Sequence, residues 1–399
     1  MKKIIVLAFF LGALATASCQ RTDVPTPGGQ PLTLSSARFG AESSAFAFEF
    51  FNTLLAAEAP NANVLASPLS LHVALGMLLN GADGKTADEL LTALRLKGYS
   101  PEQYNQIYRQ LTEGLPKVDD QVTVAIANSV WYQQNLSVEA GYVAALKSTF
   151  AADVFPLTGD PAPVNRWVNE KTRGKIKELS IDPATVMLLL NAVYFKGDWK
   201  YRFDEKATFN GNFNFANGRK KLVPTMSQQG TFRRAFAPEY AAVELPYGGG
   251  DYRMTVVLPK AGTDVTAFAK TFDVKAWDAL QSQLGEGALI VKLPRFEFAY
   301  EYKPGLNAML VAMGIRGAFA GGLTKIRKQD DLFVSMVKQK AYIKTDEKGS
   351  EAAAVTSVEI QLTSLPTAPP TFHADRPFLF FITEKNTGTV LFAGRVSEP

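Results

Sequence analysis

The sequence predicts an α+β fold, with helices gathered in the first half of the chain and strands in the second. Long apolar or amphipathic stretches occur early, whereas the later apolar stretches are short and are separated by glycine and proline. Of the 399 residues, 47% are apolar and 20% are charged, a balance typical of a globular protein with a sizeable core. Because no long linker or internal repeat interrupts residues 37–399, we expect them to form a single domain.

Three early segments are predicted to be helices. Residues 45–55 carry too many apolar side chains for one helical stripe, which predicts a helix buried on most of its sides. Ser67 is placed to cap a second helix that has Pro68 in its first turn and ends at the glycine-containing cluster of residues 81–84. Residues 85–94 follow as an amphipathic helix.

Apolar runs of strand length predict the sheets. Residues 122–132 and 184–195 are almost uniformly apolar and are expected to be central strands. Residues 164–179 lie between them and predict a helix that stops at Gly174. The remaining expected elements are strands over 241–247, 251–260, 288–302 and 334–349, a short helix over 304–315, and a closing hairpin over 376–396 that turns at Asn386, Thr387 and Gly388.

The first 18 residues predict an export signal. Two lysines precede a short apolar run and then small residues, a layout typical of secretory signals, and the run is too short to span a membrane. Cys19, the single cysteine of the chain, excludes an intrachain disulfide and lies where bacterial lipoproteins are lipidated, although Thr16 replaces the usual leucine of that motif. Residues 19–36 would then be a flexible tether to a bacterial membrane. The alternative is cleavage after Ala17, which leaves a secreted or periplasmic protein with a free thiol.

The charge distribution argues against a nucleic-acid partner. The net charge is +4, and the tightest basic pairs are Lys220 with Lys221 and Arg233 with Arg234. No aromatic side chains alternate with basic ones in a stripe, so we interpret these pairs as solvated surface.

Residues 347–370 combine the pattern of a strand with the ending of a loop. From Ser350 onward, the even-numbered positions are small and then apolar, while the odd-numbered positions hold Glu351, Glu359 and Gln361. This period of two suits a strand with one face on a core. Gly349 provides a flexible pivot at its start, and three later prolines cannot donate to a sheet. The segment is either a mobile surface loop with chance alternation or a segment that is exposed in one state and a strand in another.

Several motifs in order along residues 46–395 resemble the serpin family. The stretches SPLSLHVALGMLLNGADGKTADEL, NAVYFKGDWKYRF, ELPY, VLP, LPRFEF, DEKGSEAAAVT and ADRPFLFFI follow one another at family-like spacing. Each motif is weak alone, but together they cover nearly all of the folded chain. The resemblance implies a serpin fold, in which helices surround a large central mixed sheet and smaller sheets and a reactive loop, here about residues 347–371, is exposed.

The resemblance further implies a suicide inhibitor of proteases. A target protease attacks a bond in the loop, and the cut loop inserts into the main sheet as an extra strand with the acyl-enzyme attached. The hinge that must enter the sheet is compact and therefore of inhibitory type. It comprises Glu347, Gly349, Ser350, Ala352, Ala353, Ala354 and Thr356.

Family spacing places the reactive bond between Thr363 and Ser364, with Leu362 and Leu365 as alternative positions before the cut. Threonine suits elastase-like serine proteases, and the preceding leucine suits subtilisin-like serine proteases and papain-like cysteine proteases. Cleavage after Leu362 would instead suit chymotrypsin-like enzymes. No lysine or arginine lies between Gly349 and Arg376, so trypsin-like enzymes are expected to be poor targets.

Two groups of residues are expected, by resemblance, to control insertion. Ser67, Ser70, Asn191 and Gln339 occupy the sheet-opening region. Gln339 stands where many relatives have histidine, which argues against opening controlled by pH at this position. Trp199, Arg295 and Glu347 lie near the top of the sheet, where the arginine and the glutamate are expected to form an ion pair that holds the hinge strand.

An enzyme and a carrier are the competing functions. The chain has two histidines: His72 in an apolar helix, expected to be packed structure, and His373 after the loop, expected to be exposed. No GxSxG, phosphate-binding glycine loop, HExxH or metal-ligand cluster accompanies them, so neither catalysis nor a cofactor or metal is expected. The alternative within the same fold is a non-inhibitory binding or carrier protein. We expect a monomer whose partners are proteases.

Overall fold

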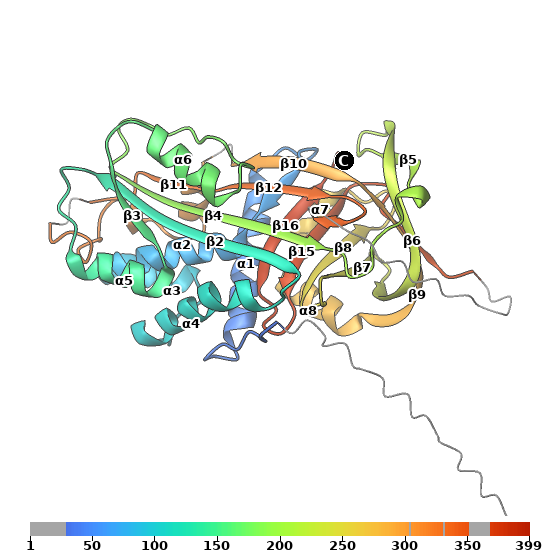
Figure 1. Cartoon of the computed structure of the whole chain (residues 1–399), viewed down its shortest axis with the longest axis horizontal. Coiled ribbons are helices and arrows are strands. Elements are labelled where there is room, and N and C mark those ends of the chain that lie inside the picture. The colour runs from blue at the N-terminus through green and yellow to red at the C-terminus, as the bar shows by residue number, and fades with distance from the viewer. Residues whose placement is uncertain (1–28, 303–304, 330–331, 351–367) are drawn as a thin grey trace, which may run out of the picture.

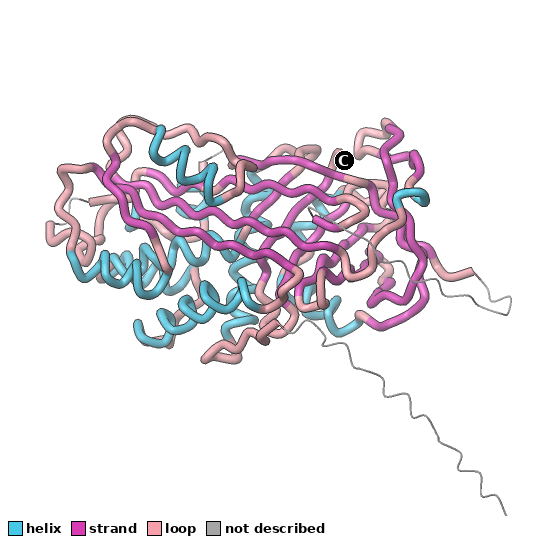
Figure 2. Tube along the Cα trace, viewed as in Figure 1, coloured by secondary structure: helices cyan, strands magenta, loops and turns pink. Residues whose placement is uncertain are grey.

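The structure is a computed structural model that describes residues 29–302, 305–329, 332–350 and 368–399. Figures 1 and 2 show an elongated molecule in which long strands run side by side and most helices gather at one end. The helices are α1 (Phe39–Ala57), α2 (Pro68–Gly81), α3 (Gly84–Ala93), α4 (Pro101–Gly114), α5 (Ala140–Phe150), α6 (Ala162–Lys171), α7 (Val265–Thr271), α8 (Val274–Gln283) and α9 (Leu306–Ala312), with short 3-10 turns η1 (Leu115–Lys117), η2 (Glu205–Ala207) and η3 (Gly317–Phe319).

The strands of the described residues form three hydrogen-bonded sheets. The largest has the order β1 (Val64–Ala66), β16 (Val390–Val396), β15 (Phe378–Glu384), β8 (Tyr252–Pro259), β7 (Tyr240–Tyr247), β6 (Lys220–Phe236), β9 (Gly285–Pro294) and β14 (Thr371–His373), with β5 (Phe209–Asn214) on β6. The second has the order β11 (Met336–Lys338), β4 (Met187–Asp198), β2 (Val122–Gln133) and β3 (Asp153–Leu157), with β13 (Gly349–Ser350) also on β4. The third pairs β10 (Phe296–Glu301) with β12 (Lys340–Thr345). The α+β prediction is confirmed.

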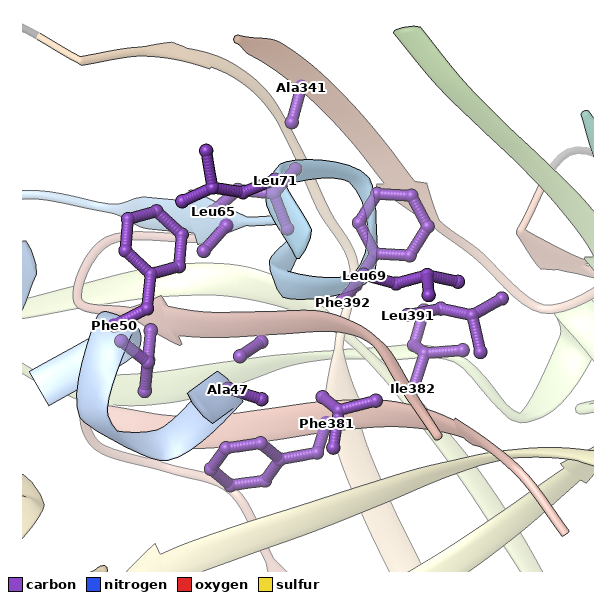
Figure 3. Close-up of a cluster of buried hydrophobic side chains, with 14 of the residues drawn as sticks. Ala47, Phe50, Leu65, Leu69, Leu71, Ala341, Phe381, Ile382, Leu391 and Phe392 are labelled. Atoms are coloured by element: carbon purple, nitrogen blue, oxygen red, sulfur yellow. The ribbon is translucent and has the colours of Figure 1, made fainter. Parts of the chain in front are cut away.

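The main core lies around α1 and α2, where the sequence predicts the most apolar helices. Every residue of α2 except Asn80 is buried, and α1 is buried along most of its length. Figure 3 shows side chains of α1, α2, β1, β12, β15 and β16 converging in this core. The prediction that residues 45–55 form a helix buried on most sides is confirmed.

Helix α6 covers the opposite face of the second sheet. Its Val164, Trp167 and Val168 pack in a separate apolar cluster with Leu188 and Leu190 of β4. The odd-numbered residues of β4, such as Leu189, belong instead to the main core. Both faces of β4 are therefore buried, which explains why its sequence is apolar at nearly every position.

The strand predicted over residues 334–349 is interrupted at Gln339. Its first part, β11, pairs in parallel with β4 from Met336 opposite Leu188 to Lys338 opposite Leu190. Its second part, β12, pairs only with β10. The prediction of one continuous strand is thus wrong in this detail, because the chain leaves the β4 ladder at a residue whose side chain binds elsewhere.

The folded part of the chain starts before residue 37. Leu32 is only 7% exposed, and it fills the space left by the missing side chain of Gly114. The backbone N–H of Gln30 donates to the carbonyl of Lys117 at 2.8 Å, and that of Ser35 donates to Gln110 Oε1 at 2.8 Å. The prediction of a tether over residues 19–36 is therefore wrong for residues 29–36, which are docked on α4 and η1.

His72 is packed structure, as the sequence predicts. Its ring lies edge-on to Phe39 and Phe46. Its Nε2–H donates to the carbonyl of Leu94 at 3.1 Å, and Nδ1 faces the hydroxyl of Tyr108 at 3.1 Å. Burial outweighs the hydrogen bond to Leu94 and lowers the pKa of His72 to about 4, so the ring is neutral in the folded protein.

We expect acid to destabilise the protein through His72. Because its folded-state pKa lies below the ordinary value of 6.5, its contribution to stability is fully present above about pH 6.5 and is lost as the pH falls toward 4. The expected loss is about 3 kcal/mol. Thermal unfolding of the wild type and of His72→Gln at pH 7, 6, 5 and 4 checks this: the variant should show the flatter profile, and parallel profiles would contradict the assignment.

Candidate functional site

A groove separates β4 from β12 along the half of β4 that follows Leu190. The β11–β4 ladder ends at Lys338 opposite Leu190, and β12 makes no ladder with β4. A narrow cavity of about 20 Å³, partly open to solvent, lies in this space. It is lined by Thr172, Lys175, Ile176, Val193, Tyr194, Phe195, Tyr342, Ile343, Lys344, Ser350, Ile382 and Phe392. Figure 1 shows β4 and β12 running lengthwise side by side, with α6 over the sheet that contains β4.

The hinge turns into the groove at Gly349. The backbone groups of Asp346 and Gly349 exchange hydrogen bonds of 3.0 and 3.2 Å, which reverses the chain after β12. Gly349 has φ +140, and an added Cβ would lie 2.3 Å from the carbonyl oxygen of Gly197. Only glycine fits this close approach. The sequence prediction of a pivot at Gly349 thus has a steric basis.

Ser350 occupies the first rung of the groove. Gly349 pairs with Asp198, and Ser350 pairs with Gly197, both antiparallel to β4. The Ser350 residue is 4% exposed, and its hydroxyl lies 3.1 Å from that of Tyr247. The Ser350 side chain therefore points to the main core, as the period-two pattern predicts for even-numbered positions.

Trp199 contacts the turn through its side chain and its backbone. Its indole stacks on Tyr247 with ring centroids 4.4 Å apart, and its Nε1–H donates to the carbonyl of Asp346 at 2.9 Å. Its backbone N–H donates to the carbonyl of Lys348 at 2.8 Å. The predicted residue at the top of the sheet thus contacts the turn directly.

Glu347 and Arg295 form an ion pair at the same place. Arg295 Nη2 lies 2.6 Å from Glu347 Oε1, and its Nε–H donates to the same oxygen at 2.8 Å. Thr208 also donates its hydroxyl proton to this oxygen. Burial opposes ionisation of Glu347, but the hydrogen bonds from Arg295 and Thr208 outweigh it and lower the pKa of Glu347 below its ordinary value.

The four residues of the sheet-opening region form two buried hydrogen-bonded pairs. Ser70 donates its hydroxyl proton to Asn191 Oδ1, which joins α2 to β4. The backbone N–H of Ser67 donates to Gln339 Oε1 at 3.1 Å, and Gln339 Nε2 donates to the carbonyl of Ser67 at 3.0 Å. Ser67 is the N-cap residue of α2, but its hydroxyl does not cap the helix. It donates to the carbonyl of Leu391 at 2.8 Å, so the expected cap is corrected to a link with β16.

Two members of this network are missing from the sequence prediction. Asn128 accepts from Asn191 Nδ2 and donates to the carbonyl of Phe150, and Tyr302 donates its hydroxyl proton to Gln339 Oε1. Asn128 is a polar residue inside an apolar strand, which was a usable signal because buried amides need partners. Tyr302 lies in a run of aromatic residues and carries no such signal.

The other predicted residues of the loop and anchor lie outside the described residues. They are Ala352, Ala353, Ala354, Thr356, Leu362, Thr363, Ser364, Leu365 and Cys19. The chain resumes before β14, where Thr371 pairs in parallel with Ile290 of β9.

Both histidines lie among the described residues, and their contacts are structural. Both ring nitrogens of His72 face Leu94 and Tyr108 rather than a nucleophile. His373 is half-buried beside Phe209, not fully exposed as expected, because β14 adds to the edge of a sheet. Within the ranges that the structure describes, no cluster of histidine, cysteine and carboxylate side chains could hold a metal, and no helix has the length and apolar character of a membrane span.

Comparison with known proteins identifies the relatives of this architecture. The sequence model described as "Serpin (serine protease inhibitor)" matches residues 41–399. Iripin-2 of Ixodes ricinus is 35% identical over 85% of this chain and 88% of its own length. The native thermophilic serpin tengpin superposes with a TM-score of 0.84 at 27% identity, covering 93% of this chain and 97% of its own.

Human thyroxine-binding globulin, solved with its ligand, has a TM-score of 0.82 at 25% identity and covers 91% of this chain and 99% of its own. The fold is thus compatible with a ligand-binding protein as well as with inhibitors. The family match over nearly the whole chain supports protease inhibition in general rather than catalysis. The family model covers nearly the whole chain, and the groove and the turn at Gly349 are consistent with it. The chain belongs to the serpin family.

Proposed function

We propose that the protein is a suicide inhibitor of endopeptidases. A target protease cleaves a bond in the loop that follows the hinge, and the cut loop enters the groove between β4 and β12 with the acyl-enzyme still attached. The inhibitor itself turns over no substrate. The result is a covalent complex in which the active site of the protease no longer has the geometry needed to cleave the loop.

The pairing of Ser350 with Gly197 is the observation that carries this proposal. It provides one formed rung of the strand that insertion would complete. The groove continues from that rung between two strands that do not pair with each other. An entering strand would gain backbone hydrogen bonds on both sides, each worth about 1 kcal/mol net.

Extension of this register supports insertion of the hinge. Continued residue by residue, it sets Ala352 opposite Phe195, Ala354 opposite Val193 and Thr356 opposite Asn191. These three β4 residues lie on the face that packs toward the main core. Small side chains are what this crowded face can accept. Glu351 falls on the other face, opposite Lys196, where a charge is tolerated.

The remaining predicted residues have roles that follow from their contacts. Trp199 and the pair of Glu347 with Arg295 hold the turn in place before cleavage. The links of α2 to Asn191 and Gln339 resist separation of β4 from β11 until the loop arrives.

The proposed reactive bond joins Thr363 to Ser364, with cleavage after Leu362 or Leu365 as alternatives. The proposed targets are elastase-like or subtilisin-like serine proteases, and papain-like cysteine proteases. A small residue preceded by leucine suits all three classes, and the absence of lysine and arginine disfavours trypsin-like enzymes.

We also propose export of a monomer. The signal-like first 18 residues support export, and Cys19 supports a lipid anchor in a bacterial membrane. Because residues 29–36 are docked on the domain, the free part of the tether would be residues 19–28. Without lipidation, the protein would be secreted or periplasmic.

Incubation with an elastase, a subtilisin, a papain-like protease and trypsin, followed by a denaturing gel, tests the function and the target class. We expect bands at the summed mass for one or more of the first three enzymes and none for trypsin. Mass spectrometry should place the start of the released fragment at Ser364. Clean cleavage by all enzymes without any complex would contradict inhibition and favour the carrier alternative.

A further inference from the structure

We infer that a second surface, separate from the loop, contacts the body of the target protease through Lys292. This inference rests on the proposed function and concerns how fast the protease binds, not what happens after the cut. The surface is the outer face of β6, β9 and β14, which we call the docking face. It comprises Ser227, Gln229, Ile290, Lys292, Thr371 and His373.

The strand registers place these six side chains on one face of the sheet. The pairing of β14 with β9, and of β9 with β6, sets them in two rows of three. Phe372 and Val291 lie between the rows and are buried, with exposures of 1% and 0%. Because side chains along a strand alternate in direction, the six point to the opposite, outer side. None of the six is buried.

The docking face adjoins the point where the loop returns to the sheet. Seven residues, 364–370, separate the proposed reactive bond from Thr371 at the start of β14, and they span at most about 25 Å. A protease domain of about 220 residues has a radius of gyration of about 17 Å. A body of that size on so short a connection overlies the neighbouring surface. Figure 1 shows β5, β6 and β9 at the end of the molecule opposite α4 and α5.

Lys292 gives the docking face a positive charge. Within the part of the chain that the structure describes, no carboxylate forms an ion pair with Lys292, and Asp375, near His373 in the sequence, is paired with Arg376 at 2.7 Å. The Lys292 ammonium lies 5.4 Å from the centroid of the Phe209 ring, which is 39% exposed. An ammonium held against an exposed ring is available to a carboxylate of a docking protein.

The surface therefore fits a protease with carboxylates on the side of its cleft that holds the residues after the cut. Opposite charges at the edge of an interface raise the rate of encounter more than they change later steps. The docking face belongs to the largest sheet, whereas the groove lies between β4 and β12 of the other two. Lys292 should thus affect the association rate and leave the fraction of complexes that become trapped unchanged.

The test compares the wild type with Lys292→Glu, Lys292→Gln and Lys97→Glu, using an elastase, a subtilisin or a papain-like protease that complexes the wild type. Lys97→Glu makes the same charge change at an exposed lysine between α3 and α4. At low salt, Lys292→Glu should slow association about tenfold, Lys292→Gln should slow it less, and Lys97→Glu should leave it unchanged. The difference should shrink at high salt. All four proteins should bind the same number of protease molecules per inhibitor and melt at the same temperature.

The possible results separate this inference from the proposed function. Equal association rates for Lys292→Glu and wild type, or an equal fall in Lys97→Glu, would overturn the docking face and leave inhibition intact. Faster association of Lys292→Glu would mean that the protease presents basic groups there, and the assigned carboxylate would be wrong. If the wild type forms no complex with any of the three proteases, the inhibitory function is wrong and the docking face falls with it.

Discussion

Replacing Ser350 by arginine is expected to turn the inhibitor into a substrate. The Ser350 side chain faces the main core at the first rung of the groove, beside the hydroxyl of Tyr247. An arginine there would bury a guanidinium without a carboxylate partner, which costs several kcal/mol. Ala352→Arg should act in the same way, because the proposed inserted strand would set residue 352 opposite Phe195, on the side that faces the core.

Gel analysis with a protease that complexes the wild type checks this expectation. Ser350→Arg and Ala352→Arg should give cleaved inhibitor and free, active protease, with complex yield reduced at least about tenfold. Ser350→Ala is the matched control, since it removes the contact with Tyr247 but stays small, and it should retain complex formation. Normal complex yield in either arginine variant would contradict insertion of the hinge.

Glu347→Lys is expected to release the hinge turn and promote association between copies of the chain. The Glu347 side chain is 4% exposed and its partner Arg295 is 43% exposed, so the pair is only partly shielded from water. Its loss should therefore cost about 2 kcal/mol, below the 3–5 kcal/mol of a fully buried pair. The new lysine would also face Arg295 as a like charge.

Size-exclusion chromatography after mild heating measures the effect of Glu347→Lys. We expect the monomer fraction to fall and larger loop-linked species to appear. Glu205→Lys makes the same charge change nearby, at a side chain that is 64% exposed and 3.9 Å from Lys348, and it should leave the monomer fraction unchanged. Equal monomer fractions for Glu347→Lys and Glu205→Lys would contradict the role of the Glu347–Arg295 ion pair in holding the hinge turn.

The pair should also make the hinge sensitive to acid. The folded-state pKa of Glu347 lies below its ordinary value. Its contribution to stability is therefore present above the pKa of the unfolded chain and is lost as the pH falls through the folded-state pKa.

Local sequence patterns predicted the strands and the hinge because their physical causes are local. The apolar runs predicted β2 and β4 correctly, because both faces of these strands are buried. The alternation after Gly349 predicted that the Ser350 side chain faces the core, because successive side chains in a strand point in alternate directions. The ion pair of Glu347 with Arg295 came from family resemblance rather than from pattern, because the two residues are distant in sequence.

Features that depend on one distant contact were missed or misplaced. Gln339 interrupts its strand because its amide binds Ser67, and no alternation in residues 334–349 records that partner. Leu32 is one apolar side chain in a polar segment, and it can dock only because Gly114 has no side chain there. The hydroxyl of Ser67 reaches Leu391 across 324 residues, whereas the motif alone indicates a helix cap.

The melting temperature of the protein before and after a single cut in the loop tests the central claim most directly. Insertion of the cut loop completes a strand between β4 and β12, so the cleaved form should melt about 10 °C or more above the intact form. Ser350→Arg, cut in the same way, should show a much smaller rise. An unchanged or lower melting temperature for the cut wild type would mean that the loop does not enter the groove, and the proposed mechanism would be wrong.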